Sequence, residues 1–209
     1  MHGLLYGGYF ADHFHVGLSL RYASNSADTE RDIVVGSFSQ TARADFDSGI
    51  SGARLELGLS DIRLGRFFVQ PLAAVSLTRS DQDGFTETGA PGLNLTVDDE
   101  DADSAVGTVG FRLYRNYFMG EGTWITPKIS LNWLHEFGDE DRRTRAAFEA
   151  MSANLFIVEG TELPRDTGQI RIGWTATTRD NLQFYLNYDG QACSDLFEHA
   201  LSLRARFLW

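Results

Sequence analysis

The sequence predicts an all-β protein, an antiparallel transmembrane β-barrel of about twelve strands, of which eleven or twelve are present in this chain. Three observations predict this class. Apolar and polar residues alternate along many short segments, turn-forming residues separate these segments, and no stretch approaches the ~18 consecutive apolar residues of a membrane helix. The 209 residues suit a single domain, and no linker divides them, so we take 1–209 as one unit.

Alternation is strongest in six segments. In the first of them, Phe14, Val16 and Leu18 alternate with His15 and Gly17. Successive side chains on a strand point to opposite faces, so each such segment has one apolar and one polar face. In chain order the six segments are 13–22, 52–59, 125–133, 169–174, 182–187 and 201–209.

Weaker alternation marks 4–10, 38–46, 67–78 and 105–114. The segment 142–150 is another candidate strand, although its alanine-rich composition also suits a short helix. Residues 93–97 would add a twelfth strand. Turn-like residues at 47–49, 138–141 and 179–181 separate these elements.

The polar faces of the predicted strands carry ionisable groups in mid-strand, which favours a hydrated barrel interior in which opposite charges pair. Aromatic residues lie near segment ends, where interfacial girdles would form. The alternative is a soluble β-domain whose apolar faces pack inward and whose polar faces are solvated. The residues that we expect to line the interior are Arg21, Arg43, Arg54, Glu56, Lys128, Arg171, Arg204 and Arg206.

Charge and cysteine content exclude several classes of protein. The net charge of −11 gives no basic face for a nucleic acid, so none is expected as a partner. The single cysteine, Cys193, rules out an internal disulfide and a cysteine zinc site, and we expect a free thiol in a surface loop. The first twenty residues lack the pattern of a signal peptide, so an export signal would lie on a longer precursor.

Catalytic and metal-binding motifs do not emerge. The sequence contains neither a GxSxG elbow nor a GxxxxGK[ST] loop, and Glu87, Glu136 and Glu149 have no evident partner for acid–base work. His13 and His15 have a chelating spacing but no third ligand, and the acidic run 98–103 lacks the spacing of a calcium loop. We therefore expect no enzyme activity, no cofactor and no metal.

The chain ends on an aromatic residue that is preceded by apolar residues at every second position. Leu201, Leu203, Ala205, Phe207 and Trp209 form this series. Outer-membrane barrels end in this way, which favours the membrane barrel over the soluble domain.

Ordered blocks along almost the whole chain resemble the C-terminal translocator domain of autotransporters, the type V secretion proteins of Gram-negative bacteria. The single blocks are weak, but their order and spacing are specific. In sequence letters they are YGGYF at 6–10, HVGLSLRY at 15–22, ARADFD at 42–47, GARLELG at 52–58, FVQPLA at 68–73, VGFRL at 109–113, PKISLNWLHEF at 127–137 and the end 199–209.

The resemblance implies an outer-membrane barrel that anchors an upstream passenger and helps to export or display it on the cell surface. It also implies three partners: outer-membrane lipid, the barrel assembly machinery and the covalently attached passenger. In the family the assembly machinery reads the terminal aromatic pattern, which falls here on Leu201, Leu203, Phe207 and Trp209.

Two departures from the family pattern are visible. The last residue is Trp rather than the commoner Phe, and the sequence shows no helix that would thread the pore, so we expect the domain to lack this helix and its first strand here. A stand-alone porin or adhesin-type barrel is the alternative function, and a soluble ligand-binding β-barrel is a further one.

Overall fold

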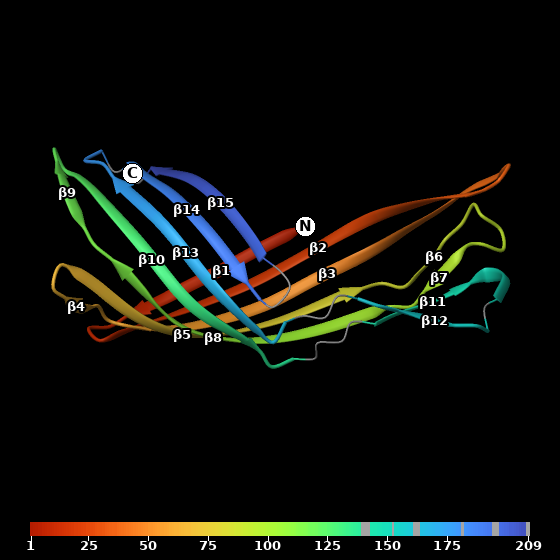
Figure 1. Ribbon diagram of the computed structural model, residues 1–209, viewed down its shortest axis with the longest axis horizontal. Coiled ribbons are helices and arrows are strands. Elements are labelled where there is room, and N and C mark those ends of the chain that lie inside the picture. Colours follow the sequence, from red (N-terminus) through yellow and green to blue (C-terminus); the bar gives the residue numbers. More distant parts are fainter. Residues whose placement is uncertain (139–142, 152, 161–163, 181, 194–196, 208–209) are drawn as a thin grey trace.

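The computed structural model describes residues 1–138, 143–151, 153–160, 164–180, 182–193 and 197–207, which form two antiparallel sheets (Figure 1). The larger sheet has eleven strands, and nine of them follow one another in the order β1-β2-β3-β5-β8-β10-β13-β14-β15. Short β4 pairs with β5, and short β9 pairs with β10. The predicted all-β antiparallel class is confirmed.

The strands of the larger sheet lie close to the segments with period-two alternation. Their bounds are β1 (His2–Phe10), β2 (Phe14–Val35), β3 (Phe38–Leu59), β4 (Ile62–Leu64), β5 (Phe67–Gln82), β8 (Glu100–Tyr114), β9 (Tyr117–Gly120), β10 (Thr123–Glu136), β13 (Asp166–Thr177), β14 (Leu182–Ala192) and β15 (Phe197–Phe207).

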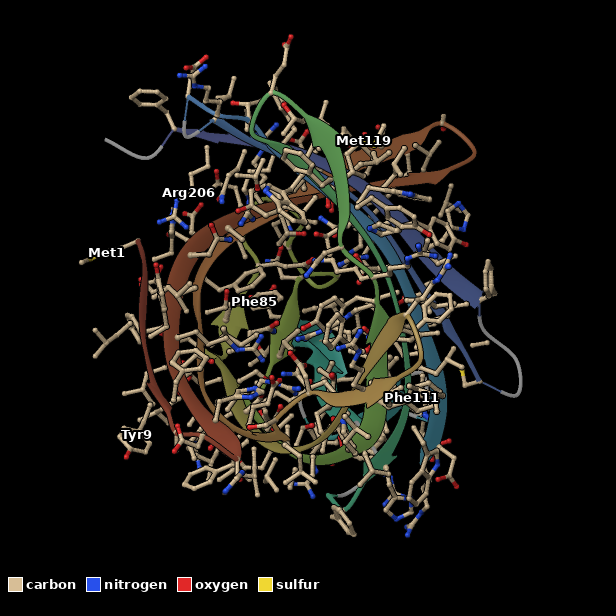
Figure 2. The ribbon with its side chains drawn as sticks, turned by 90° about the vertical axis from the view of Figure 1, so that its left-hand side faces the viewer. Met1, Tyr9, Phe85, Phe111, Met119 and Arg206 are labelled. Atoms are coloured by element: carbon tan, nitrogen blue, oxygen red, sulfur yellow. The ribbon has the colours of Figure 1, made fainter. Side chains whose placement is uncertain are left out.

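The sheet curls around a central space, as Figure 2 shows in a view from one end. Its two end strands, β1 with Met1 and β15 with Arg206, lie on the same side of this ring. Among the described residues no backbone pairing joins β1 to β15, so the wall is curled but not closed by its own ladder.

Strands β2 and β3 form a hairpin that is much longer than the sequence predicts. Each has 22 residues, roughly 70 Å at the usual rise per residue, whereas a tilted membrane strand needs about 9–11 residues. The predicted turn at 47–49 is wrong, because these residues lie inside β3. The chain reverses instead at Gly36, whose φ of 63° suits a two-residue hairpin turn.

The smaller sheet lies at the end of the larger sheet to which the tip of the β2–β3 hairpin points (Figure 1). We call this end the long-loop end. The smaller sheet has the order β12-β11-β7-β6. The predicted segment 93–97 contributes a strand to it, and the described part of 142–150 forms a strand followed by a single 3-10 turn, Glu149–Met151. The bounds are β6 (Phe85–Thr86), β7 (Leu95–Val97), β11 (Arg143–Phe148) and β12 (Phe156–Glu159).

The apolar side chains of the larger sheet face outward. Leu18, Leu55 and Val75 are register partners on three adjacent strands, and they are 48%, 53% and 52% exposed. All the buried apolar residues of the described part are alanines. A soluble sandwich would bury its large apolar side chains between two sheets, so this distribution excludes that alternative.

The described part of the chain contains no helix that is long and apolar enough to cross a membrane.

The outward face predicts how the protein tolerates a new charge. We expect Leu55→Arg to lower the level of folded protein in the outer membrane, because an arginine facing lipid near the midplane costs about 2–4 kcal/mol. Ala200→Arg is the matched control: its position pairs with Asp189 and faces the interior. Equal outer-membrane levels of the two variants, measured by heat-modifiable gel mobility, would contradict the assignment of faces.

Candidate functional site on the concave face

Four of the predicted interior residues meet in one cavity. Arg54 and Glu56 come from β3, Lys128 from β10 and Arg171 from β13, and they line a space of about 230 Å³ on the concave face. Side chains two apart on a strand share a face, and register partners on neighbouring strands do so too. The cavity is completed by Leu72, Arg112, Ser130, Asn132, Ile172, Gly173, Asn187, Asp189 and Ser202.

Ion pairs and hydrogen bonds tie these side chains to the wall. Arg54 Nη2 lies 3.1 Å from Glu56 Oε2, and its Nη1 donates to Ser76 Oγ at 2.9 Å. Arg171 Nε lies 2.8 Å from Asp189 Oδ1. The partners sit on the same or adjacent strands, so the pairs run along the wall rather than across the central space.

Arg21 lies in a second cavity of the concave face, toward the long-loop end. This space of about 1180 Å³ also contacts Gly52, Thr78 and Ser104. The Arg21 Nη2 atom donates to Thr78 Oγ1 at 2.7 Å. This cavity is larger than the one around Lys128, and its lining includes small residues beside Arg21 as well as the longer side chains of Arg79 and Phe137.

Arg204 and Arg206 also point to the concave face, but they lie on the end strand β15. Ser202 lines the first cavity, and alternation places the two arginines on the same face. Their register partners are Tyr185 and Gln183, and both arginines are exposed.

Arg43 does not line the interior, and this prediction is wrong. It pairs in register with Glu30 on the outward face, the face of Leu55, and its Nε lies 3.1 Å from Glu30 Oε2. The error follows from the predicted turn at 47–49. In a continuous β3, Arg43 and Arg54 are an odd number of residues apart and must face opposite sides.

The terminal apolar residues face outward, as their alternation with the arginines requires. Leu201, Leu203 and Phe207 pair with Tyr188, Leu186 and Leu182 and are 73%, 78% and 56% exposed. Trp209 lies outside the described residues.

Long polar side chains on the concave face pack against glycines of the neighbouring strand. His15 and Gly58 are register partners, as are Arg21 and Gly52. A Cβ added to Gly58 would fall 1.9 Å from His15 Cε1, and one added to Gly52 would fall 2.7 Å from Arg21 Nε. Each long side chain therefore lies flat on its opposite glycine instead of projecting into the central space.

The remaining candidates take structural roles. His15 Nε2 lies 3.8 Å from Glu56 Oε1, while the backbone of His13 holds the β1–β2 turn by accepting from Ser60 N at 2.9 Å. In the part of the chain that the structure covers, no group of three or more His, Cys, Asp or Glu side chains could hold a metal ion. Cys193 is half-buried and forms no disulfide there.

The sequence analysis did not predict the ion pair between Arg31 and Glu87, which joins the β2–β3 hairpin to the smaller sheet. We call this pair the latch. Arg31 donates from Nε and Nη2 to the two carboxylate oxygens of Glu87 at 3.1 and 2.5 Å. Arg31 Nη2 also donates to Leu93 O at 2.8 Å, and Leu95 N donates to Glu87 at 2.8 Å. The partners are 56 residues apart, so no local pattern could have revealed them.

Burial makes this latch more than a surface pair. Glu87 is 4% exposed, and Ala42 and Ala90 in the same contact region are fully buried. Phe46 and Phe85 stack with ring centroids 4.9 Å apart. The hydrogen bond from Arg31 holds the pKa of the Glu87 carboxyl below its ordinary value, against the desolvation that would raise it.

Two other glutamates cap backbone groups. Glu136 accepts from Ser104 Oγ at 2.6 Å, from Ala105 N at 2.7 Å and from Gly138 N at 2.8 Å. Glu149 Oε2 accepts from Gly92 N and Asn94 Nδ2, both at 2.9 Å. Like Glu87, they fix loops at the long-loop end, so the partners that the sequence did not reveal are structural.

Comparisons with known proteins agree with this geometry. The family model described as "Autotransporter beta-domain" matches residues 1–189. The crystal structure of the beta domain of the Bordetella autotransporter BrkA superposes with a TM-score of 0.64 at 20% identity, covering 98% of this chain and 70% of that one.

A curated relative is the extracellular serine protease of Serratia marcescens. It is 24% identical over an alignment 220 residues long, which covers 97% of this chain. The chain spans only 20% of the length of that relative.

The latch predicts a local and pH-dependent stability. We expect Glu87→Gln to speed amide hydrogen exchange around Glu87 and Leu95 by about 5–30-fold, since a part-buried charged hydrogen bond contributes about 1–2 kcal/mol. A glutamate whose pKa is lower in the folded protein than in the unfolded chain stabilises the fold at pH values above its unfolded pKa of about 4.3. In the wild-type protein, the protection of these amides from exchange should therefore be full at neutral pH and should fall as the pH drops through the folded pKa of Glu87.

Glu30→Gln is the control for the latch, because the Arg43–Glu30 pair is exposed on both sides. Exchange in this variant should stay at the wild-type rate. An equal effect of the two substitutions, or protection in Glu87→Gln that equals the wild-type protection at every pH, would show that the latch does not hold the smaller sheet.

The side chains that lie flat on opposite glycines predict which glycines can be replaced by a larger residue. Gly52→Val should destabilise the protein by about 1–3 kcal/mol, because the new side chain overlaps Arg21 Nε and lies 3.1 Å from Leu77 O. Gly17→Val, also on the concave face, meets nothing within 4 Å and should be tolerated. The denaturation midpoints of the two variants in detergent micelles measure these stabilities. Equal midpoints would refute the close packing of Arg21 on Gly52.

Proposed function

This chain belongs to the autotransporter β-domain family, and we propose that it is an outer-membrane translocator for a linked passenger. Its concave face would form the wall of the passenger's aqueous route. One observation carries the proposal: around the Lys128 cavity, the larger sheet has apolar side chains on its outward face and charged side chains on its concave face. Leu55 and Leu131 are exposed, whereas Arg54 and Arg171 share a cavity.

The two ends of the sheet suggest how the domain lies in the membrane. Outer-membrane barrels have short periplasmic turns and longer extracellular loops. Residues 65–66 and 121–122 make tight turns at one end, whereas the smaller sheet and the β2–β3 tip extend from the other (Figure 1). We therefore place the acidic run 98–103 and the Arg31–Glu87 latch on the cell surface.

The smaller sheet lies over the outer mouth of this route. Phe85 of β6 falls near the middle of the ring in the end-on view (Figure 2), and the side view places β6 beside the extended part of the β2–β3 hairpin (Figure 1). A passenger leaving the central space would pass this sheet, which the latch fixes to the hairpin.

We assign enzyme activity of the full-length protein to the passenger and none to this chain. The curated relative is a serine protease, but this chain aligns with only 20% of its length. Arg54 and Arg171 of the concave face pair with Glu56 and Asp189 along the wall, an arrangement that supports a lining role rather than a catalytic one.

The partners follow from the two faces. The outward apolar face would contact outer-membrane lipid, and the barrel assembly machinery would read the series Leu201, Leu203, Phe207 and Trp209. Arg204 and Arg206 on the opposite face of β15 would pair with carboxylates of the segment that connects to the passenger. The exposure of both faces of β15 supports these two roles.

The terminal strand predicts an assembly defect. Phe207→Asp, or deletion of Trp209, should leave the protein in the periplasm, where it is degraded. Arg206→Ser is the control, because it changes the neighbouring residue on the other face of the same strand. The measurement is the amount of protein in outer-membrane fractions, and a normal level of Phe207→Asp would refute the assignment of this signal.

A further inference from the structure

The cavity around Lys128 carries an excess of positive charge. Four cationic side chains and two carboxylates line it, although the chain as a whole has a net charge of −11. The cations are Arg54, Arg112, Lys128 and Arg171, and the carboxylates are Glu56 and Asp189.

Both carboxylates are already engaged. Glu56 pairs with Arg54 at 3.1 Å and Asp189 pairs with Arg171 at 2.8 Å. Arg112 Nη1 donates to the neutral Gln70 Oε1 at 2.7 Å. Within the described residues, neither Arg112 nor Lys128 has a carboxylate within 4.0 Å that would form an ion pair with it.

The wall holds Lys128 in place. Lys128 is the register partner of Gly173, and a Cβ added to that glycine would fall 2.5 Å from Lys128 Cε and 2.6 Å from Asn187 Oδ1. The aliphatic stem of the lysine therefore lies on the bare backbone of β13 and is half-buried there. The charge is thus fixed at the wall rather than free to move with a flexible side chain.

Neutral hydrogen-bonding groups complete the cavity. Ser130, Asn132, Asn187 and Ser202 supply hydroxyl and amide groups beside the cations. Fixed cations with neutral donors bind carboxylates and other oxyanions, and rings of Lys and Arg make pores anion-selective.

We propose that this cavity is a binding site for small soluble anions, such as carboxylates or inorganic oxyanions, with Arg112 and Lys128 as its principal charges. The proposal rests on the proposed function, since it requires the concave face to enclose water. It assigns to the route a selectivity for anions over cations of equal size.

The test measures the local potential with a thiol in the cavity. Ser202→Cys is introduced into the full-length protein in which Cys193 is replaced by serine. Outer membranes are treated with two methanethiosulfonate reagents of similar size, one with a sulfonate and one with a trimethylammonium group. We expect a higher ratio of anionic to cationic reaction rates than for free cysteine.

Removing the two cations should lower this ratio. Adding Lys128→Gln and Arg112→Gln should reduce it by about 5–10-fold, because two nearby unit charges are lost. Lys128→Arg keeps the charge and should keep the ratio. Arg43→Gln removes one positive charge from the outward face and should leave the ratio unaltered. Heat-modifiable gel mobility verifies that each variant is folded.

Three outcomes would overturn the anion site: a ratio no higher than that of free cysteine, a ratio that the double variant leaves unchanged, or a thiol that neither reagent reaches because protein fills the cavity. Passenger display is scored on the same cells. Normal display without charge discrimination refutes the anion site alone, whereas a parent protein that displays no passenger refutes the proposed function.

Discussion

Backbone hydrogen bonding in lipid is the constraint on which the rest of this structure depends. A bilayer offers no partner to an N–H or C=O group, so each membrane strand must be satisfied by its neighbours. The ladder from β1 to β15 provides this pairing on both sides of every inner strand and on one side of each end strand in the described part of the chain. Once the backbone is committed to strands, side chains can only alternate between two faces, and lipid decides which face is apolar.

This constraint explains both the success and the failure of the sequence prediction for β2 and β3. Between Phe14 and Tyr22 the outward residues face lipid and are apolar, so alternation is visible. Beyond that level the outward positions are Asp28, Glu30 and Asp45, which face water. The concave positions of β3 at this level are Ala42, Ala44 and Phe46, and they pack under the smaller sheet. The apolar face has therefore changed sides, and one strand looks like two segments divided by a turn. Arg43 was placed on the wrong face for this reason.

Contacts between distant segments limited what could be predicted of the site. That Arg54 and Glu56 share a face follows from a spacing of two. That Lys128 lies opposite Gly173, or that Arg31 reaches Glu87, depends on the register and course of strands that are far apart in sequence. In the hairpin, Asp28 pairs in register with Asp45, and their hydrogen bond and mutual repulsion raise the pKa of Asp45. No single-segment pattern contains this pairing.

The glycines connect the fold with the route through it. A glycine inside a strand weakens the sheet, because it packs no side chain and costs more backbone entropy. At Gly52, Gly58 and Gly173 the missing side chain is replaced by the flat body of Arg21, His15 or Lys128 from the neighbouring strand. The wall recovers packing, and these side chains lie along it instead of pointing into the central space. A barrel lined by upright arginines and lysines would have the same charges but less room, so the pairing of bare backbone with long cations makes a charged wall compatible with the passage of a polypeptide.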